Sequence, residues 1–226
     1  MSLLTGLYTY EVALLVLGVA FFVILLAAFI RSVLRSQSYT ALFPFFGLTV
    51  AMIGYPGIKS FQYKDGVVTI ERITDQLQKD PANEDLRETL TEQVTEIADR
   101  PNSTPEALAS IGTAQFALGD HEAARMNLDK ALLASPTLPE VTKLQALITL
   151  DEKLTTLTEQ AEQNPGDLAA GAELKRAATE VSQLPVASPV LLGKAARAEM
   201  IVGNKAAAES LADKVRRIGP KRLIAK

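Results

Sequence analysis

The chain has 226 residues, 48% of them hydrophobic, and a formal net charge of −3. This acidic balance argues against a nucleic-acid partner, because phosphate binding needs clustered Lys and Arg. The lack of cysteine excludes disulfides, thiol nucleophiles and cysteine metal sites. Charge is unevenly distributed, since Glu11, Arg31 and Arg35 are the only charged residues among the first 58. We therefore expect a membrane anchor over residues 1–58, followed by a mildly acidic domain in contact with water.

A first membrane-spanning helix is predicted over residues 11–34. Residues 12–30 carry no charge, and at ~1.5 Å per residue such a run reaches roughly 30 Å, the thickness of one bilayer core. A cleaved signal peptide is the alternative. It fits poorly, because no Lys or Arg precedes the run and the run is too long for the apolar region of a signal peptide.

A second span is predicted over residues 39–58, which are also uncharged and just long enough to cross a bilayer. Membrane helices tolerate Gly and Pro better than soluble helices do. In this segment these residues are Pro44, Gly47, Gly54, Pro56 and Gly57. Tyr39 and Tyr55 stand near its ends, as interface-anchoring aromatics do. A re-entrant or surface-lying segment is the alternative.

The positive-inside rule gives the expected orientation. Arg31 and Arg35 lie in the short link between the two spans, whereas the N-terminal tail holds no base. The link is therefore expected in the cytoplasm and both ends outside. In a bacterium this places the chain in the inner membrane, with its water-exposed domain in the periplasm. That domain is cytoplasmic if residues 39–58 do not span. Residues 59–65 are expected to form a linker.

Residues 66–226 are expected to form an all-α domain of about four helical hairpins. Apolar residues recur there at helical spacing, and prolines separate the helices. Asp65-Gly66 is expected to start the first helix, with a hairpin turn as the alternative. The expected segments, in chain order, are 66–79 with 83–99, 105–138, 139–163 with 167–184, and 189–222. The segment before the Gly166-Asp167 turn forms either one long helix or two short ones.

Residues 105–138 carry the strongest pattern. Gly119-Asp120 makes a turn between two helices, with Gly ending the first helix and Asp capping the second. Small residues stand where paired helices approach closely. They are Gly112, Ala124 and Ala131. The segment closely resembles a tetratricopeptide repeat (TPR), although Gln115 stands where that family usually has an aromatic residue.

The pattern recurs in residues 189–222. Nine positions are identical in an ungapped alignment: Pro105/Pro189, Leu108/Leu192, Ala114/Ala198, Gly119/Gly203, Ala123/Ala207, Ala124/Ala208, Asp129/Asp213, Lys130/Lys214 and Pro136/Pro220. The matches concentrate at the turn and at small residues, and two copies make the repeat a strong signal. Between the copies, Gly166-Asp167 repeats the turn, with Ala170 and Gly171 in the small-residue positions.

The resemblance implies a TPR-like α-solenoid whose concave face, lined by the first helix of each repeat, holds peptides or partner subunits. The candidate partner-binding residues on that face are Thr113, Phe116, Lys194, Arg197, Met200 and Ile201. Lys194 and Arg197 lie one turn apart, and either pair with a carboxylate or are simply solvated. The layout of two spans and an outer TPR domain is also similar to the TPR subunit of bacterial cytochrome c maturation, which presents apocytochrome to the haem ligase. The link between the spans is shorter here.

No residue constellation for catalysis stands out. His121 is the only histidine, and its place just after a helix cap leads us to interpret it as a surface residue. No histidine remains for a triad or a metal shell, and no glycine-rich phosphate loop occurs. We expect no enzyme activity and no cofactor.

The expected function is that of a membrane-anchored adaptor or scaffold. It would bind a protein partner beside the lipid bilayer, in the assembly of a membrane or periplasmic complex. The alternative is a permanent structural accessory subunit of a membrane complex, respiratory or photosynthetic. A fixed stoichiometry with the partner would distinguish the subunit from the adaptor.

Overall fold

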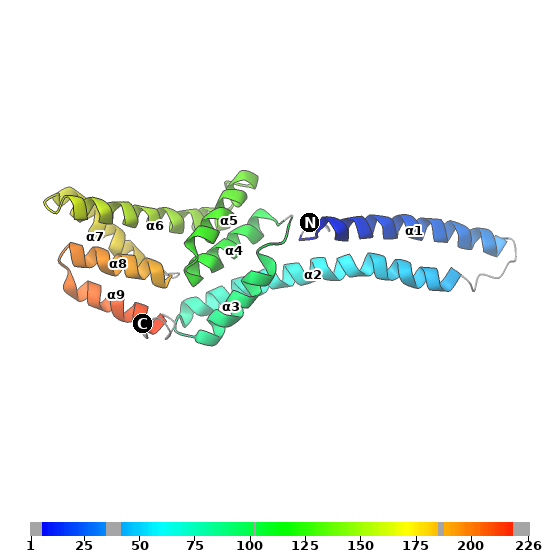
Figure 1. The fold of residues 1–226 in the computed structure, drawn as a ribbon, viewed down its shortest axis with the longest axis horizontal. Helices are drawn as coiled ribbons and strands as arrows, with labels where there is room; N and C mark the ends of the chain where they lie inside the picture. Colours follow the sequence, from blue (N-terminus) through cyan, green and yellow to red (C-terminus); the bar gives the residue numbers. More distant parts are fainter. Residues whose placement is uncertain (1–5, 35–41, 102, 185–187, 219–226) are drawn as a thin grey trace. The chain divides into compact units, whose positions relative to one another are not determined.

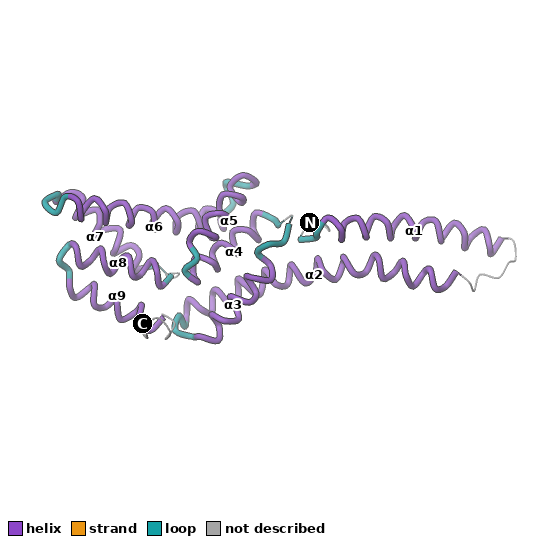
Figure 2. Tube along the Cα trace, viewed as in Figure 1, coloured by secondary structure: helices purple, strands orange, loops and turns teal. Residues whose placement is uncertain are grey.

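The computed structural model describes residues 6–34, 42–101, 103–184 and 188–218. Within these ranges the chain is all-helical, with nine helices and no strand (Figures 1 and 2). It divides into two compact units. The first comprises Met1–Gly66 with Asp99–Thr104, and the second comprises Val67–Ala98 with Pro105–Lys226.

The first unit contains α1 (Thr9–Leu34) and the N-terminal part of α2 (Phe43–Lys79). Among the described residues, α1 is the one helix long and apolar enough to cross a membrane by length and composition. It packs closely on α2, because a Cβ at Gly18 would lie 2.9 Å from Cγ1 of Ile53. Aromatic contacts add to this packing, since Phe22 and Phe29 each meet Phe46 edge-to-face at 6.2 Å between ring centroids.

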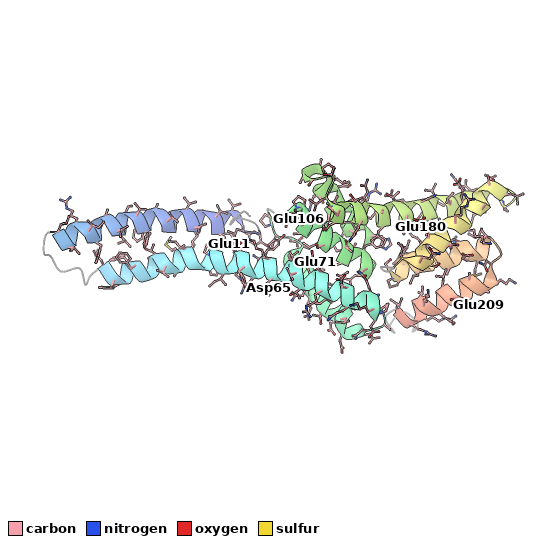
Figure 3. The ribbon with its side chains drawn as sticks, turned by 180° about the vertical axis from the view of Figure 1, so that it is seen from behind. Glu11, Asp65, Glu71, Glu106, Glu180 and Glu209 are labelled. Carbon is pink, nitrogen blue, oxygen red and sulfur yellow. The ribbon has the colours of Figure 1, made fainter. Side chains whose placement is uncertain are left out.

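Residues 59–65, which the sequence predicts to be a linker, lie within α2, which runs through them as continuous helix. The segment holds no proline, and Tyr63 anchors it by packing, 2% exposed, against the backbone of Gly6. Asp65 and Gly66 therefore lie in the interior of α2 and neither start a helix nor form a turn (Figure 3).

The second span expected over residues 39–58 does not meet the length-and-composition test that α1 meets. Its described part forms the first turns of α2, where glycines and prolines dilute the apolar residues and Lys59 follows. Residues 39–41 and most of the link after Arg31, Arg35 included, lie outside the described residues.

The second unit consists of the C-terminal part of α2 followed by seven helices. They are α3 (Glu84–Ile97), α4 (Pro105–Leu118), α5 (His121–Ala134), α6 (Pro139–Gln163), α7 (Leu168–Gln183), α8 (Pro189–Ile201) and α9 (Lys205–Ile218). Residues 139–163 thus form one long helix. The helices pack as hairpins, α4 with α5, α6 with α7, and α8 with α9. In addition α4 contacts α6 and α6 contacts α8, so the first helices of successive hairpins are neighbours.

The turn of the internal repeat has the same geometry in both copies. Gly119 and Gly203 have φ of 97° and 81°, the left-handed region that ends helices. The amide of Asp120 donates to the carbonyl of Gln115 at 2.9 Å, and the amide of Asn204 donates to the carbonyl of Glu199 at 2.8 Å. This is the Schellman pattern, and it confirms the predicted turn. The last matched pair, Pro136/Pro220, lies partly outside the described residues.

Small residues lie at the helix contacts in α4, α5 and α9. Ala124 and Ala131 are 0% exposed and Ala208 is 3% exposed. At Gly112 a Cβ would lie 2.5 Å from Cδ2 of Leu144. Gly171, one of the two small-residue positions predicted in α7, is not at a close contact, because a Cβ there would meet nothing within 4 Å. In α7 the close contacts come two turns later, at Ala177 and Ala178, which are buried.

Overpacking one of these contacts should destabilise the second unit. Ala124→Leu is expected to lower the free energy of unfolding by about 1–3 kcal/mol, because the larger side chain has no room between α4 and α5. Ala169→Leu, at an exposed position on α7, is the matched control and should change it by less than about 0.5 kcal/mol. Urea melts of the full chain in mild detergent measure both. An equal loss of unfolding free energy in the two variants would contradict a close contact of α4 with α5 at Ala124.

Candidate partner-binding groove

Two of the predicted partner-binding residues line a groove between α6 and α8. This groove has a volume of about 290 Å³ and is lined by Thr155, Thr158, Glu159 and Glu162 of α6 and by Lys194 and Arg197 of α8. Because α6 and α8 are the first helices of successive hairpins, the groove lies on the face where the sequence predicts partner binding. Its walls carry both signs of charge.

Arg197 and Glu162 form an exposed ion pair across this groove. Nη2 and Nε of Arg197 donate to the same Oε1 of Glu162 at 2.6 and 2.9 Å. The two side chains are 65% and 41% exposed, so solvent screens the pair and it contributes at most about 1 kcal/mol to stability. A ligand with its own charges can therefore exchange with either member at little cost.

Lys194 is held by a buried carboxylate. Its Nζ donates to both oxygens of Asp151 at 2.8 and 2.9 Å and to Oγ1 of Thr155 at 3.0 Å. The side chains of Lys194 and Asp151 are 33% and 11% exposed. Lys194 and Arg197 thus each pair with a carboxylate of α6 in this chain, and pairing with a partner's carboxylate stays a prediction.

Asp151 also joins His121 to this network. Nδ1 of His121 lies 3.0 Å from Oδ2 of Asp151, and because a carboxylate only accepts, Nδ1 is the donor. Burial by itself would raise the pKa of Asp151. The hydrogen bonds and charges of His121 and Lys194 outweigh burial and hold this pKa below its ordinary value. Asp151 therefore stays ionised and links α5, α6 and α8.

His121 is not the surface residue that the sequence suggests. Its side chain is only 17% exposed, and its ring stacks on Phe116 with 4.3 Å between centroids. Its Nε2 lies 2.8 Å from Oγ of Ser188, which in turn caps α8 by accepting from the amide of Leu191 at 3.0 Å. The imidazole thus connects the start of α5 to the start of α8.

Ser188, His121 and Asp151 follow the order of hydrogen bonds found in serine hydrolase triads. Ser188 is 0% exposed, and its oxygen already accepts the amide that caps α8. A nucleophile must reach a substrate carbonyl, and this hydroxyl has no surface from which to do so. The arrangement holds three helices in register.

The remaining predicted partner-binding residues differ in accessibility. Phe116 stacks beneath the ring of His121 and is 0% exposed. It therefore cannot contact a partner. Thr113 donates to the carbonyl of Ala109 within α4, and Ile201 packs against the core. Met200 is 68% exposed and follows Arg197 by nearly one turn of α8, so it remains available beside the groove.

Sequence reasoning missed two buried polar clusters. Asp151 is the one charged residue on the buried stripe of α6 that includes Leu144, Leu147 and Leu154, and a charge on a buried stripe signals a partner. Gln115, which departs from the TPR pattern, is 8% exposed and accepts a hydrogen bond from Nδ2 of Asn127 at 2.7 Å. A polar residue in an aromatic position was the available signal for this pair.

Comparison with models of known protein families, with curated protein sequences and with solved structures finds no match to this chain. In the described part of the chain, no group of three or more His, Asp or Glu residues is placed to hold a metal ion.

Proposed function

We propose that this protein is a membrane-anchored adaptor whose second unit, Val67–Ala98 with Pro105–Lys226 and called the helical-hairpin unit below, docks a protein partner in the groove between α6 and α8. The observation that carries the proposal is the exposed, exchangeable Arg197–Glu162 pair on neighbouring first helices, with Met200 open beside it. Neighbouring first helices and the duplicated Gly turn support a TPR-like solenoid, the architecture in which such a face binds peptides or subunits.

Apolar exposure supports the anchor. Val23 and Ile24 on α1, and Phe43 and Val50 on α2, are each more than half exposed. A soluble monomer rarely exposes such a contiguous apolar surface, so a lipid bilayer is its natural environment. In this proposal α1 and the apolar start of α2 both span, and the helical-hairpin unit lies in the periplasm beside the complex whose assembly it serves.

A photo-crosslinking amino acid at Met200 tests the docking face in native membranes. We expect a discrete protein adduct, identified by mass spectrometry. The same group at Leu133, which is 90% exposed on α5, is the matched control and should not capture that protein. Identical adducts from both positions would contradict the groove as the docking face.

Charge reversal sharpens this test. Arg197→Glu should reduce the Met200 adduct at least about tenfold, because it places like charges across the groove. Stability should change by no more than about 1 kcal/mol, since the native pair is exposed. An unchanged adduct yield would show that the partner does not use this groove. Substoichiometric recovery of the partner in mild detergent is expected for an adaptor, and a fixed ratio would favour a permanent subunit.

A further inference from the structure

A second cavity lies in the helical-hairpin unit, where the end of α9 meets the turn between α2 and α3 (Figure 1). It has a volume of about 310 Å³. Its walls are mainly apolar and come from helices far apart in sequence, with Leu77 of α2, Val181 of α7, Leu192 of α8 and Ile218 of α9 among them. All four of these side chains are buried.

Three cations line the same cavity: Arg87, Lys214 and Arg217. Its described lining includes no Asp or Glu, and none of the ion pairs among the described residues involves these three. Arg87 is only partly exposed and hydrogen-bonds the carbonyl of Pro81 at 3.3 Å. Burial lowers the pKa of its guanidinium, so an anion beside it would offset a real desolvation cost.

Thr74 adds an unpaired hydroxyl to this lining. Its side chain is 4% exposed, and its Oγ1 has no hydrogen-bond partner in the described structure. Other helical threonines, such as Thr89 and Thr95, donate to the carbonyl four residues earlier. Thr74 does not, although a buried hydroxyl without a partner destabilises the protein. A donor is thus left for a ligand inside an apolar cavity.

We infer that this cavity binds a small amphiphilic carboxylate, an aliphatic monocarboxylate of about eight carbons. The cations attract the carboxylate, the Thr74 hydroxyl donates to it, and the apolar walls cover the hydrocarbon tail. Octanoate is small enough to enter a cavity of about 310 Å³. The ligand is chemically independent of the protein partner proposed for the groove between α6 and α8.

The test uses the full chain in lipid nanodiscs with labelled Ile, Leu and Thr methyl groups, titrated with octanoate and, separately, with octanol. Octanoate should shift the methyl signals of Ile218 and Leu77 saturably, with at least about tenfold tighter binding than octanol, because only octanoate carries the charge. Protein-free nanodiscs correct for partition of each compound into lipid.

Substitutions test which side chains bind the carboxylate of octanoate. Lys214→Gln with Arg217→Gln should weaken octanoate binding at least about fivefold while octanol binding stays unchanged, because octanol carries no charge. Thr74→Val should weaken octanoate binding severalfold. Both cations are exposed, so the double variant keeps the fold. Lys143→Gln with Lys153→Gln, exposed on α6, is the matched control. Equal binding of octanoate and octanol, or no saturable shift, would overturn the inference. So would octanoate binding that appears only after deletion of residues 219–226, since the chain's own tail would then be the occupant.

Discussion

Asp151→Ala is expected to lower the free energy of unfolding by about 3 kcal/mol, because it breaks a largely buried charge network. Lys194 would lose two of its three hydrogen bonds and keep only Thr155. His121 would lose the acceptor of its Nδ1–H while its ring stays packed on Phe116. Unmatched donors that remain partly buried account for most of the loss. Chemical denaturation of the full chain measures it.

The adjacent residue provides the control for this prediction. Glu152 pairs with Arg125 at 2.7 Å, but the two side chains are 48% and 62% exposed. Glu152→Ala should therefore change stability by less than about 1 kcal/mol. If the two alanine variants were equally stable, the Asp151 network would not hold the helices together.

The stabilisation by Asp151 should depend on pH in a defined direction. Its pKa in the folded protein lies below the ordinary value of 3.8. The contribution is therefore fully present above about pH 4, and it is lost as the pH falls through the folded-state pKa. The stability difference between the natural protein and Asp151→Ala should therefore shrink as the pH falls below about 4. A difference that stays constant down to pH 3 would argue against the ionised network.

The helices of residues 105–218 follow closely from local signals in the sequence. Gly119-Asp120 and Asp167 mark turns because left-handed backbone and side-chain capping are properties of a few residues. The helix start predicted at Asp65-Gly66 is wrong, because there the structure depends on contacts distant in sequence. Glycine suggests a break, yet α2 continues because Tyr63 and Ile70 are buried on either side of it. That burial depends on tertiary contacts which local pattern does not encode.

The groove between α6 and α8 also combines features set by local sequence with features set by tertiary packing. The sequence places Lys194 and Arg197 on one face of a helix because helical spacing is local. Their partners, Asp151 and Glu162, lie on a different helix more than 30 residues away. Which carboxylate meets which cation depends on how α6 packs on α8. Sequence periodicity therefore identifies the face, and only the fold identifies the pairs.

Replacing Val50 by arginine is expected to move the helical-hairpin unit from the periplasm to the cytoplasm in most molecules. This outcome follows if α1 and the apolar start of α2 both span the membrane. An arginine near the centre of a span costs about 2.5–3.5 kcal/mol on insertion. The start of α2 carries Pro44, Gly47, Gly54, Pro56 and Gly57, so its apolar surplus is small and one such charge should prevent insertion.

Ile24→Arg provides the matched control, because Ile24 and Val50 are both 63% exposed. The longer, uninterrupted apolar run of α1 should still insert. A cysteine introduced as Glu180→Cys, at an exposed position on α7, reports the side by labelling with a membrane-impermeant maleimide, and the chain has no other cysteine. We expect labelling before the inner membrane is broken in the otherwise natural protein and in Ile24→Arg, and only afterwards in Val50→Arg. Labelling of all three only after breakage would place the unit in the cytoplasm and contradict the proposed topology.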